Sequence, residues 1–119
     1  MSHPVQHLEI SATDRVAAVA FFSAVFNFDI QDFPESGYAM IETGEGSPSI
    51  ALLPVSDDNP AGRIVPYFTT DDVAATLARA STAGGTVITE SMAVPGVGDI
   101  GVFADPTGNV MGVWKPENQ

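Results

Sequence analysis

A strand-like segment followed by a helix-like segment occurs twice in this chain, and this repeat restricts the possible folds more than any other feature. Val5–Ala12 and Ile64–Thr70 each alternate apolar and polar residues, which predicts strands with one face on a core. Apolar residues at helical spacing follow in Asp14–Phe26 and again after Asp72. Because the two aspartates lie 58 positions apart (72 − 14), we interpret the chain as two copies of one structural pattern.

The residues at the helix ends support this interpretation. Thr13 or Asp14 precedes the first helix, and Asp71 or Asp72 precedes the second, where a side-chain oxygen can accept hydrogen bonds from free backbone N–H groups. Asn27 follows the first helix and tolerates the left-handed conformation that often ends a helix. A glycine pair beginning at Gly84 predicts the end of the second helix.

Each helix is followed by three further strand-like segments, which turn-forming residues separate. We therefore predict an α+β fold of tandem βαβββ modules. In the predicted single domain (1–119), module one covers about 5–55, a polar connector covers 56–62 and module two covers about 63–116. The additional predicted strands are Phe28–Phe33, Gly37–Thr43, Ser49–Val55, Thr86–Glu90, Ile100–Ala104 and Asn109–Lys115.

The composition excludes several classes of function. With 15 acidic and 4 basic residues and a net charge of −11, the chain lacks the basic patch that binds nucleic acids or anionic membranes. It has no cysteine, which excludes disulfides, thiolate metal sites and cysteine nucleophiles. A signal-peptide pattern and an apolar run of membrane-spanning length are both absent from the sequence, which favours a cytoplasmic protein.

Four groups of residues carry a family resemblance. They are His7-Leu8-Glu9-Ile10 in the first strand, Ala20-Phe21-Phe22 leading to Val25-Phe26-Asn27-Phe28, Asp71-Asp72-Val73 with Ala83-Gly84-Gly85, and Phe103-Ala104-Asp105-Pro106-Thr107-Gly108-Asn109 ending in Trp114. Together they resemble the vicinal-oxygen-chelate superfamily, which includes glyoxalase I, bleomycin-resistance proteins and extradiol dioxygenases. The resemblance extends from about Val5 to Pro116. Asn27 departs from the pattern, because the family usually has glycine at that position.

The resemblance implies that the paired modules curl their sheets into half-open barrels around a cavity. In metal-dependent members, four inward-facing ligands come from the first and last strands of the modules. Carried over to this sequence, these positions are His7, Leu52, Val65 and Gly112, of which only His7 has a donor side chain. Since a divalent ion needs several protein ligands, we expect the usual metal site to be missing and no cofactor to be required. A different metal site formed by His7, Glu9 and Glu42 is an alternative.

Alternation along the strands sorts side chains into a helix-facing set and a cavity-facing set. On this basis we expect Ala51 and Leu53 to face the helix and Leu52 to face the cavity. The cavity-facing set combines apolar and aromatic side chains with one imidazole and two carboxylates, which is typical of small-ligand sites. The expected ligand-binding residues are His7, Glu9, Tyr38, Met40, Glu42, Leu52, Val65, Tyr67, Gly112 and Trp114.

We therefore expect a small-molecule-binding homodimer of the glyoxalase/bleomycin-resistance type, in which dimerisation covers exposed sheet edges. Tyr67 and Trp114 offer flat faces to a ring or a cation, and the carboxylates favour a positively charged ligand. The alternative is a lyase, isomerase or dioxygenase, with or without a divalent metal. In that enzyme Glu9 is the catalytic base and His7 a neutral polarising group or second base. An interaction module without a ligand is a third possibility.

Two further patterns need an interpretation. Gly96–Gly101 matches the G-x-G-x-x-G spacing of dinucleotide-binding loops, but no helix follows it. We expect these glycines to form a flexible loop that enters a strand, and closure over the cavity is one role open to it. The phenylalanines Phe21, Phe22, Phe26 and Phe28 indicate core packing together with an interface.

Overall fold

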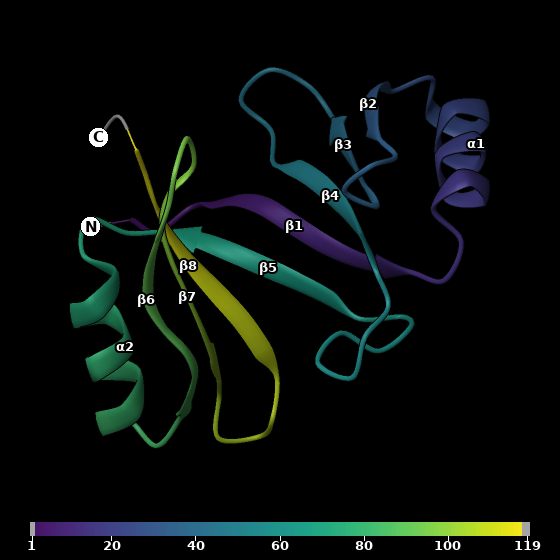
Figure 1. Cartoon of the computed structure of the whole chain (residues 1–119). Coiled ribbons are helices and arrows are strands. Elements are labelled where there is room, and N and C mark those ends of the chain that lie inside the picture. The colour runs from purple at the N-terminus through teal and green to yellow at the C-terminus, as the bar shows by residue number, and fades with distance from the viewer. Residues whose placement is uncertain (1, 118–119) are drawn as a thin grey trace. The chain divides into compact units, whose positions relative to one another are not determined.

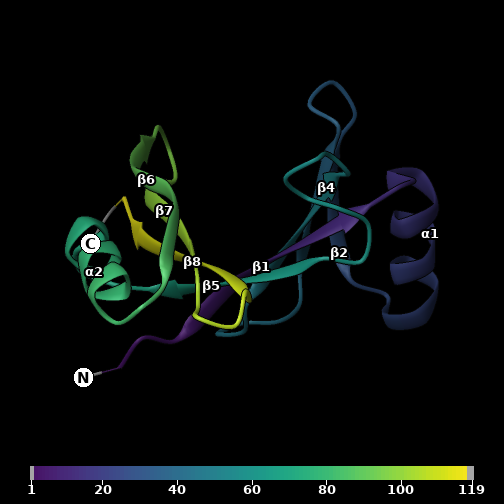
Figure 2. The ribbon, with the colours of Figure 1, turned by 90° about the horizontal axis from the view of Figure 1, so that it is seen from below.

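The structure is a computed structural model in which residues 2–117 are described. It contains the predicted order of elements, each helix being preceded by one strand and followed by three (Figure 1; Figure 2). The α+β prediction is therefore confirmed. The elements are β1 (Val5–Ala12), α1 (Arg15–Phe26), β2 (Asp29–Phe33), β3 (Tyr38–Glu42), β4 (Ser49–Pro54), β5 (Ile64–Thr69), α2 (Val73–Thr82), β6 (Thr86–Val94), β7 (Gly98–Ala104) and β8 (Val110–Pro116).

The chain forms two compact units. The first unit is Gln6–Val65, and the second comprises the chain from Pro66 onward together with the N-terminal segment up to Val5. Strand order is β2-β3-β4-β1 in the first unit and β5-β8-β7-β6 in the second. In both, the first and last strands of the pattern run parallel, β1 beside β4 and β5 beside β8. The N-terminal segment joins the second unit because the Thr69 N–H donates to the Pro4 carbonyl, at 2.9 Å.

The helix ends follow the predicted chemistry. The Asp14 and Asp72 carboxylates accept hydrogen bonds from the N–H groups of Ala17 and Ala75, each at 3.0 Å. Each therefore satisfies one of the free donors of a first helical turn. Asn27 ends α1 in the left-handed conformation with φ 55°, and its N–H donates to the Ser23 carbonyl. All three caps are among the residues expected from the sequence.

The core of the first unit lies between α1 and one face of its sheet. Its most buried members are Ala39, Ile41, Ile50 and Leu52. Partly buried apolar side chains from α1 and the neighbouring strands surround them: Leu8, Ile10, Ala18, Val19, Phe22, Phe28 and Ile30.

This core corrects the predicted orientation of β4. Ile50 and Leu52 face α1, so Leu52 lies in the core rather than on the opposite face, where Ala51 and Leu53 belong. A strand with apolar residues at four successive positions gives no alternation from which its orientation can be determined. A shift of one residue exchanges its two faces, and this is the error in the prediction.

The core of the second unit lies between α2 and its sheet. Val73 and Leu77 of α2 pack with Val113 of β8, and Phe68, Val87 and Phe103 surround them. Gly101 permits this close approach, because a Cβ there would lie 2.7 Å from Leu77 Cδ1. Neither helix in the described part of the chain is long and apolar enough to cross a membrane.

Candidate functional site

The first unit presents a partly polar sheet face on the side away from α1. The register places His7 of β1 beside Ser49 of β4, and Glu9 beside Ala51. Met40 of β3 lies on the other side of Ala51. Since side chains two residues apart point to the same face, His7 and Glu9 lie in adjacent rows roughly 7 Å apart. The structure therefore brings the predicted imidazole and one predicted carboxylate onto one surface.

Glu42 and Tyr38 extend this surface along β3. The β3–β4 register pairs Met40 with Ala51 and Ile41 with Ile50. Continued by one residue, it places Glu42 beside Ser49, in the row of His7. Glu42 is exposed, whereas His7, Glu9, Tyr38 and Met40 are half-buried. All five were expected to bind the ligand, and we name this set with Ser49 the polar face.

His7 is held by Ser49, which is not among the predicted site residues. Its Nδ1 lies 2.9 Å from Ser49 Oγ, which fixes the imidazole against β4. Burial lowers the pKa of His7 below its ordinary value of 6.5, so the ring is neutral at pH 7. A neutral imidazole can accept or donate one hydrogen bond at its second nitrogen, which suits it to bind a polar group or relay a proton.

Ser49 could have been found from the size of its neighbours. In β4 the large residues Ile50 and Leu52 alternate with the small residues Ser49 and Ala51. Bulky aliphatic side chains belong under a helix, while the small set leaves room above the opposite face. Size alternation over residues 49–52 therefore indicates the orientation of β4 where polarity does not, and Leu53 departs from it.

The second unit contributes an aromatic surface on the face away from α2. Tyr67 lies directly over Gly112 of the neighbouring strand, and a Cβ at Gly112 would collide with the Tyr67 ring. Gly112 was expected to contact the ligand, but the space where its side chain would lie is occupied by Tyr67. Val65, two residues before Tyr67 in β5, is buried and has no donor atom.

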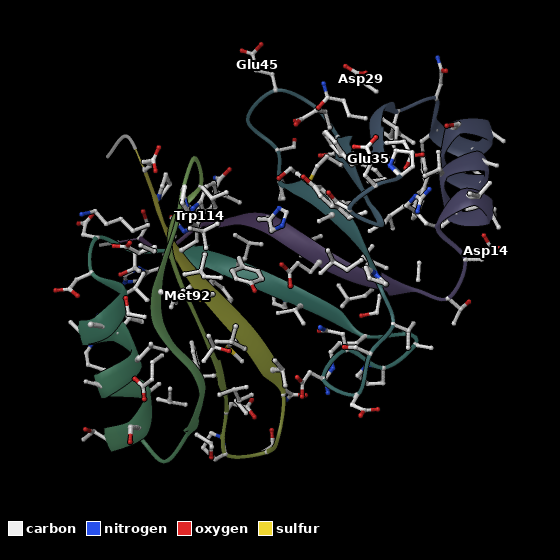
Figure 3. The ribbon with its side chains drawn as sticks, viewed as in Figure 1. Asp14, Asp29, Glu35, Glu45, Met92 and Trp114 are labelled. Atoms are coloured by element: carbon white, nitrogen blue, oxygen red, sulfur yellow. The ribbon has the colours of Figure 1, made fainter. Side chains whose placement is uncertain are left out.

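Trp114 lies on the same side of β8 as Gly112, and its neighbour across the sheet is Ile100, which pairs with Met92 (Figure 3). The Trp114 indole N–H donates to the Val97 carbonyl in the turn between β6 and β7, at 2.9 Å. This hydrogen bond holds the edge of the indole ring against the turn. Its predicted contact with a ligand stays a prediction.

The glycine-rich segment forms the turn of a hairpin and the start of β7, so it enters a strand as expected. Its closure over a cavity stays a prediction. β6 continues to Val94, beyond the predicted end at Glu90, and β7 begins at Gly98. Register irregularities between Val87 and Met92 interrupt the alternation of β6, which explains the underestimated length. Glu117 fixes the turn, because its carboxylate accepts from the Gly96 N–H at 3.0 Å and its own N–H donates to the Val97 carbonyl at 3.1 Å.

A cavity of about 400 Å³ lies beside this hairpin in the second unit. None of the predicted site residues lines it. Its walls come from β6, β7 and β8 and the residues around the turn: Ala93, Val94, Pro95, Gly98, Asp99, Lys115, Pro116 and Glu117.

The residues present do not fit the metal site that the resemblance implies. Leu52 is in the α1 core, Val65 has no donor, and the space at Gly112 is filled by the Tyr67 ring. Ser49, the neighbour of His7, supplies a neutral hydroxyl rather than a carboxylate. In residues 2–117 no three His, Asp or Glu side chains lie close enough together to hold an ion. This includes the alternative set of His7, Glu9 and Glu42.

One sequence relative matches most of this chain, and another matches less than half of it. A protein named "Putative glyoxylase CFP32" from Mycobacterium bovis is 33% identical over 105 residues, which is 86% of this chain and 40% of the relative. The anthracycline biosynthesis protein DnrV of Streptomyces peucetius is 51% identical over 49 residues, which is 41% of this chain and 18% of that protein. The matched region thus spans less than half the length of each of these two relatives.

Solved structures share the fold at low sequence identity. A hypothetical protein of Bacillus halodurans matches with a TM-score of 0.73 and 15% identity, covering 100% of this chain and 98% of that one. Methylmalonyl-CoA epimerase of Mycobacterium tuberculosis matches with a TM-score of 0.69 and 15% identity, covering 94% and 87%. A methylmalonyl-CoA epimerase in complex with methylmalonyl-CoA matches with a TM-score of 0.70 and 20% identity, covering 98% and 96%.

The family model described as the Glyoxalase/Bleomycin resistance protein/Dioxygenase superfamily matches residues 5–113. This span contains both helices and nearly all of the eight strands, in agreement with the resemblance drawn from the motifs. The chain therefore belongs to the glyoxalase/bleomycin resistance protein/dioxygenase superfamily.

Proposed function

We propose that this chain is a small-molecule-binding protein whose ligand contacts the polar face of the first unit. The observation that carries the proposal is the pair of adjacent rows containing His7 beside Ser49 and Glu9 beside Ala51. Small-ligand sites combine apolar surface with a few fixed polar groups. The Ser49 hydroxyl fixes His7, and Met40 and Tyr38 supply apolar and aromatic surface beside it.

The charges of this face favour a cationic ligand. Glu9 and Glu42 are carboxylates, whereas the lowered pKa of His7 leaves it without a compensating positive charge at pH 7. Contact of a ligand with the flat surfaces of Tyr67 and Trp114 stays a separate expectation from the sequence. The donor set argues for binding without a metal, because one imidazole is the only donor among the four positions that the resemblance implies.

The proposal includes a homodimer and a cytoplasmic location, both expected from the sequence. Each unit leaves edge strands, β2 in the first and β6 in the second, and association covers such edges. Neither feature is needed for ligand binding itself, so each can be tested separately.

Thermal shift and two-dimensional amide NMR with three matched probes test the proposal. Benzylammonium, benzyl alcohol and benzoate share a ring and differ in charge. We expect benzylammonium to bind most tightly and to shift amides around His7, Glu9 and Glu42. Glu9→Gln and Glu42→Gln should each weaken binding about tenfold, because each removes a charged partner of the ligand.

Glu45 provides the matched control. It is exposed in the turn between β3 and β4 and is not a member of the polar face (Figure 3). Glu45→Gln removes the same charge and should leave binding unchanged. Preference for benzoate, or equal losses in all three glutamine variants, would contradict a cation-binding polar face.

A proton-transferring isomerase is the second candidate, and the state of His7 favours it. A neutral imidazole fixed by Ser49, with a carboxylate two residues along the same strand, can serve as polarising group and base. Two of the similar structures are methylmalonyl-CoA epimerases, which supports testing an acyl thioester as substrate.

Deuterium exchange separates this candidate from simple binding. The protein is incubated with methylmalonyl-CoA in D₂O, and mass spectrometry follows deuterium at the carbon beside the thioester. Exchange that Glu9→Gln abolishes and Glu45→Gln preserves would establish the isomerase. Elemental analysis of protein purified without chelators tests the metal-free proposal, which stoichiometric manganese, iron, nickel or zinc lost in His7→Ala would overturn.

A further inference from the structure

Helix α1 is apolar on its outer side as well as on the side facing its sheet. Its sequence, Arg-Val-Ala-Ala-Val-Ala-Phe-Phe-Ser-Ala-Val-Phe, has one charged residue, Arg15, and one other polar residue, Ser23. Ala18, Val19 and Phe22 pack on the core of the first unit. The exposed outer face consists of Val16, Ala17, Ala20, Phe21, Ala24 and Val25.

The outer face is exposed to an unusual degree for such residues. Phe21 is 62% exposed and Val25 is 53% exposed, and both lie on the same flank of the helix, four residues apart. A helix that is apolar all round is normally buried on all sides. The three alanines lie between Val16 and the Phe21–Val25 flank, so another helix could approach the α1 axis closely.

We propose that the outer face of α1 binds the outer face of α1 in a second copy of this chain, with the two helices antiparallel. The proposal depends on the homodimer included in the proposed function, but it places the contact on α1 instead of on the edge strands β2 and β6. A two-fold axis would lie between Ala20 and Phe21, so that Ala17 of each helix would lie near Ala24 of the other.

Charge selects a second copy over other occupants. The chain carries a net charge of −11, yet the outer face has no charged side chain. Asp14 and Asp29 lie beyond the two ends of α1 rather than on its outer face (Figure 3). A basic partner would find no carboxylate here, and an anionic membrane would repel the protein. Two acidic copies can meet with least repulsion where each is uncharged.

The helix ends favour the antiparallel arrangement. The last turn of α1 has no basic residue to offset the negative end of its helix dipole. Antiparallel packing brings the positive end of the partner helix, which also carries Arg15, to that position. Arg15 is bonded to Asp32 through Nε at 2.7 Å, which holds it at the start of the helix.

Sedimentation equilibrium at micromolar concentration is the first test. We expect wild-type dimers and at least a tenfold rise in Kd for Phe21→Glu and Val25→Glu, since each would bury an unpaired charge at the interface. Ile88→Glu is the matched control, because Ile88 is 54% exposed but lies in β6 of the second unit. Circular dichroism confirms folding, which substitution at exposed positions should leave intact.

Salt dependence adds a signature that a charge-driven complex would not have. Raising the ionic strength screens repulsion between the acidic surfaces, with a Debye length of about 8 Å at 0.15 M. The Kd of the dimer should therefore fall when the salt concentration is raised from about 20 mM to about 300 mM. A complex held by opposite charges would weaken over the same range, and that result would overturn the proposed interface.

Cross-linking tests the direction of the helices, and the absence of native cysteine makes it specific. Ala17→Cys mixed with Ala24→Cys should form a disulfide-linked heterodimer, while Ala17→Cys alone should not cross-link. In the antiparallel pair the two copies of residue 17 are separated by seven residues of rise, about 10 Å. Disulfides need Cα atoms within about 7 Å.

The outcomes separate this inference from the proposed function. A wild-type monomer overturns both the interface and the dimer, while ligand binding is measured independently. A dimer that Phe21→Glu and Val25→Glu leave intact overturns this interface alone. Binding of the monomer to phosphatidylcholine vesicles, lost in the same two variants, would show that the outer face meets a lipid surface instead.

Discussion

The two units have the same order of elements but distribute their apolar residues differently. In the second unit Val73 and Leu77 of α2 are almost completely buried. Gly101 in the sheet has no side chain, which lets α2 pack closely against it. In the first unit α1 has no fully buried residue and lies over bulky Ile41 and Leu52. The strands beneath α1 therefore supply the most buried residues of the core, and several apolar side chains of α1 lie on its exposed outer face.

The faces away from the helices also differ. The first unit carries an imidazole, a hydroxyl and carboxylates in adjacent rows, which are groups that can bind charge or move a proton. The second unit carries a tyrosine ring lying over a glycine, and its hairpin turn is fixed by Trp114 and Glu117. One architecture thus supplies polar chemistry in one unit and a fixed aromatic surface in the other.

The largest predicted effect tests whether the strands carry the core of the first unit. Leu52→Ala should lower the free energy of unfolding by about 2–5 kcal/mol, because it leaves a cavity under α1. Leu52 is 1% exposed, whereas Leu53 is half-buried on the other face. Leu53→Ala removes the same atoms and should have less than half the effect in urea denaturation. Equal effects would mean that β4 has no single buried face.

The sequence predicted the fold because the relevant signals are local. Asp14 and Asp72 accept hydrogen bonds at the starts of the two helices, and Asn27 ends the first helix in the left-handed conformation. Each of these effects depends only on residues that are neighbours in the sequence. Alternation in β1 and β3 correctly placed His7, Glu9, Tyr38, Met40 and Glu42 on the face away from the helix.

The errors arose where the local signal was absent. The β4 strand is apolar at four successive positions, so only its register against β1 determines which side faces α1. The bond from Ser49 to His7 joins residues 42 positions apart, and no local pattern contains it. Similarly, Gly112 has its role through the ring of Tyr67, which belongs to a different strand.

The next effect tests the aromatic surface of the second unit. Gly112→Ala should lower the free energy of unfolding by about 1–3 kcal/mol, because the added methyl group displaces the Tyr67 ring. In a Tyr67→Leu background the same change should be less harmful, which a double-mutant cycle measures as a coupling above about 0.5 kcal/mol. Additive effects would show that the ring does not depend on the glycine.

A smaller effect is expected from acid in the first unit. The folded-state pKa of His7 is below the unfolded value of 6.5 because burial disfavours the charged ring. The folded state therefore binds fewer protons, and the free energy of unfolding should fall as the pH drops from 6.5 through the lowered pKa. His7→Gln should flatten this slope in urea midpoints measured from pH 7.5 to 5. His3→Gln is the matched control, and a slope unchanged in His7→Gln would contradict the prediction.

The smallest predicted effect is a difference in acid titration between the hairpin turns of the two units. The Asp105 carboxylate accepts hydrogen bonds from both the backbone and side chain of Asn109 and of Thr107, and these bonds lower its pKa from 3.8 to about 2. The bonds should be intact above pH 3.8 and lost as the pH falls through about 2.

In the corresponding turn between β3 and β4, Thr43 Oγ1 donates to the Pro48 carbonyl at 2.6 Å, a bond that involves no titrating group. We therefore expect the Thr107 and Asn109 amide signals to titrate with a midpoint near pH 2, while that of Ser47 does not follow this transition. Asp105→Asn should remove the titration. A midpoint near 3.8 at Asp105 would mean that the bonds do not favour the charged carboxylate, and the acid sensitivity assigned to this turn would be absent.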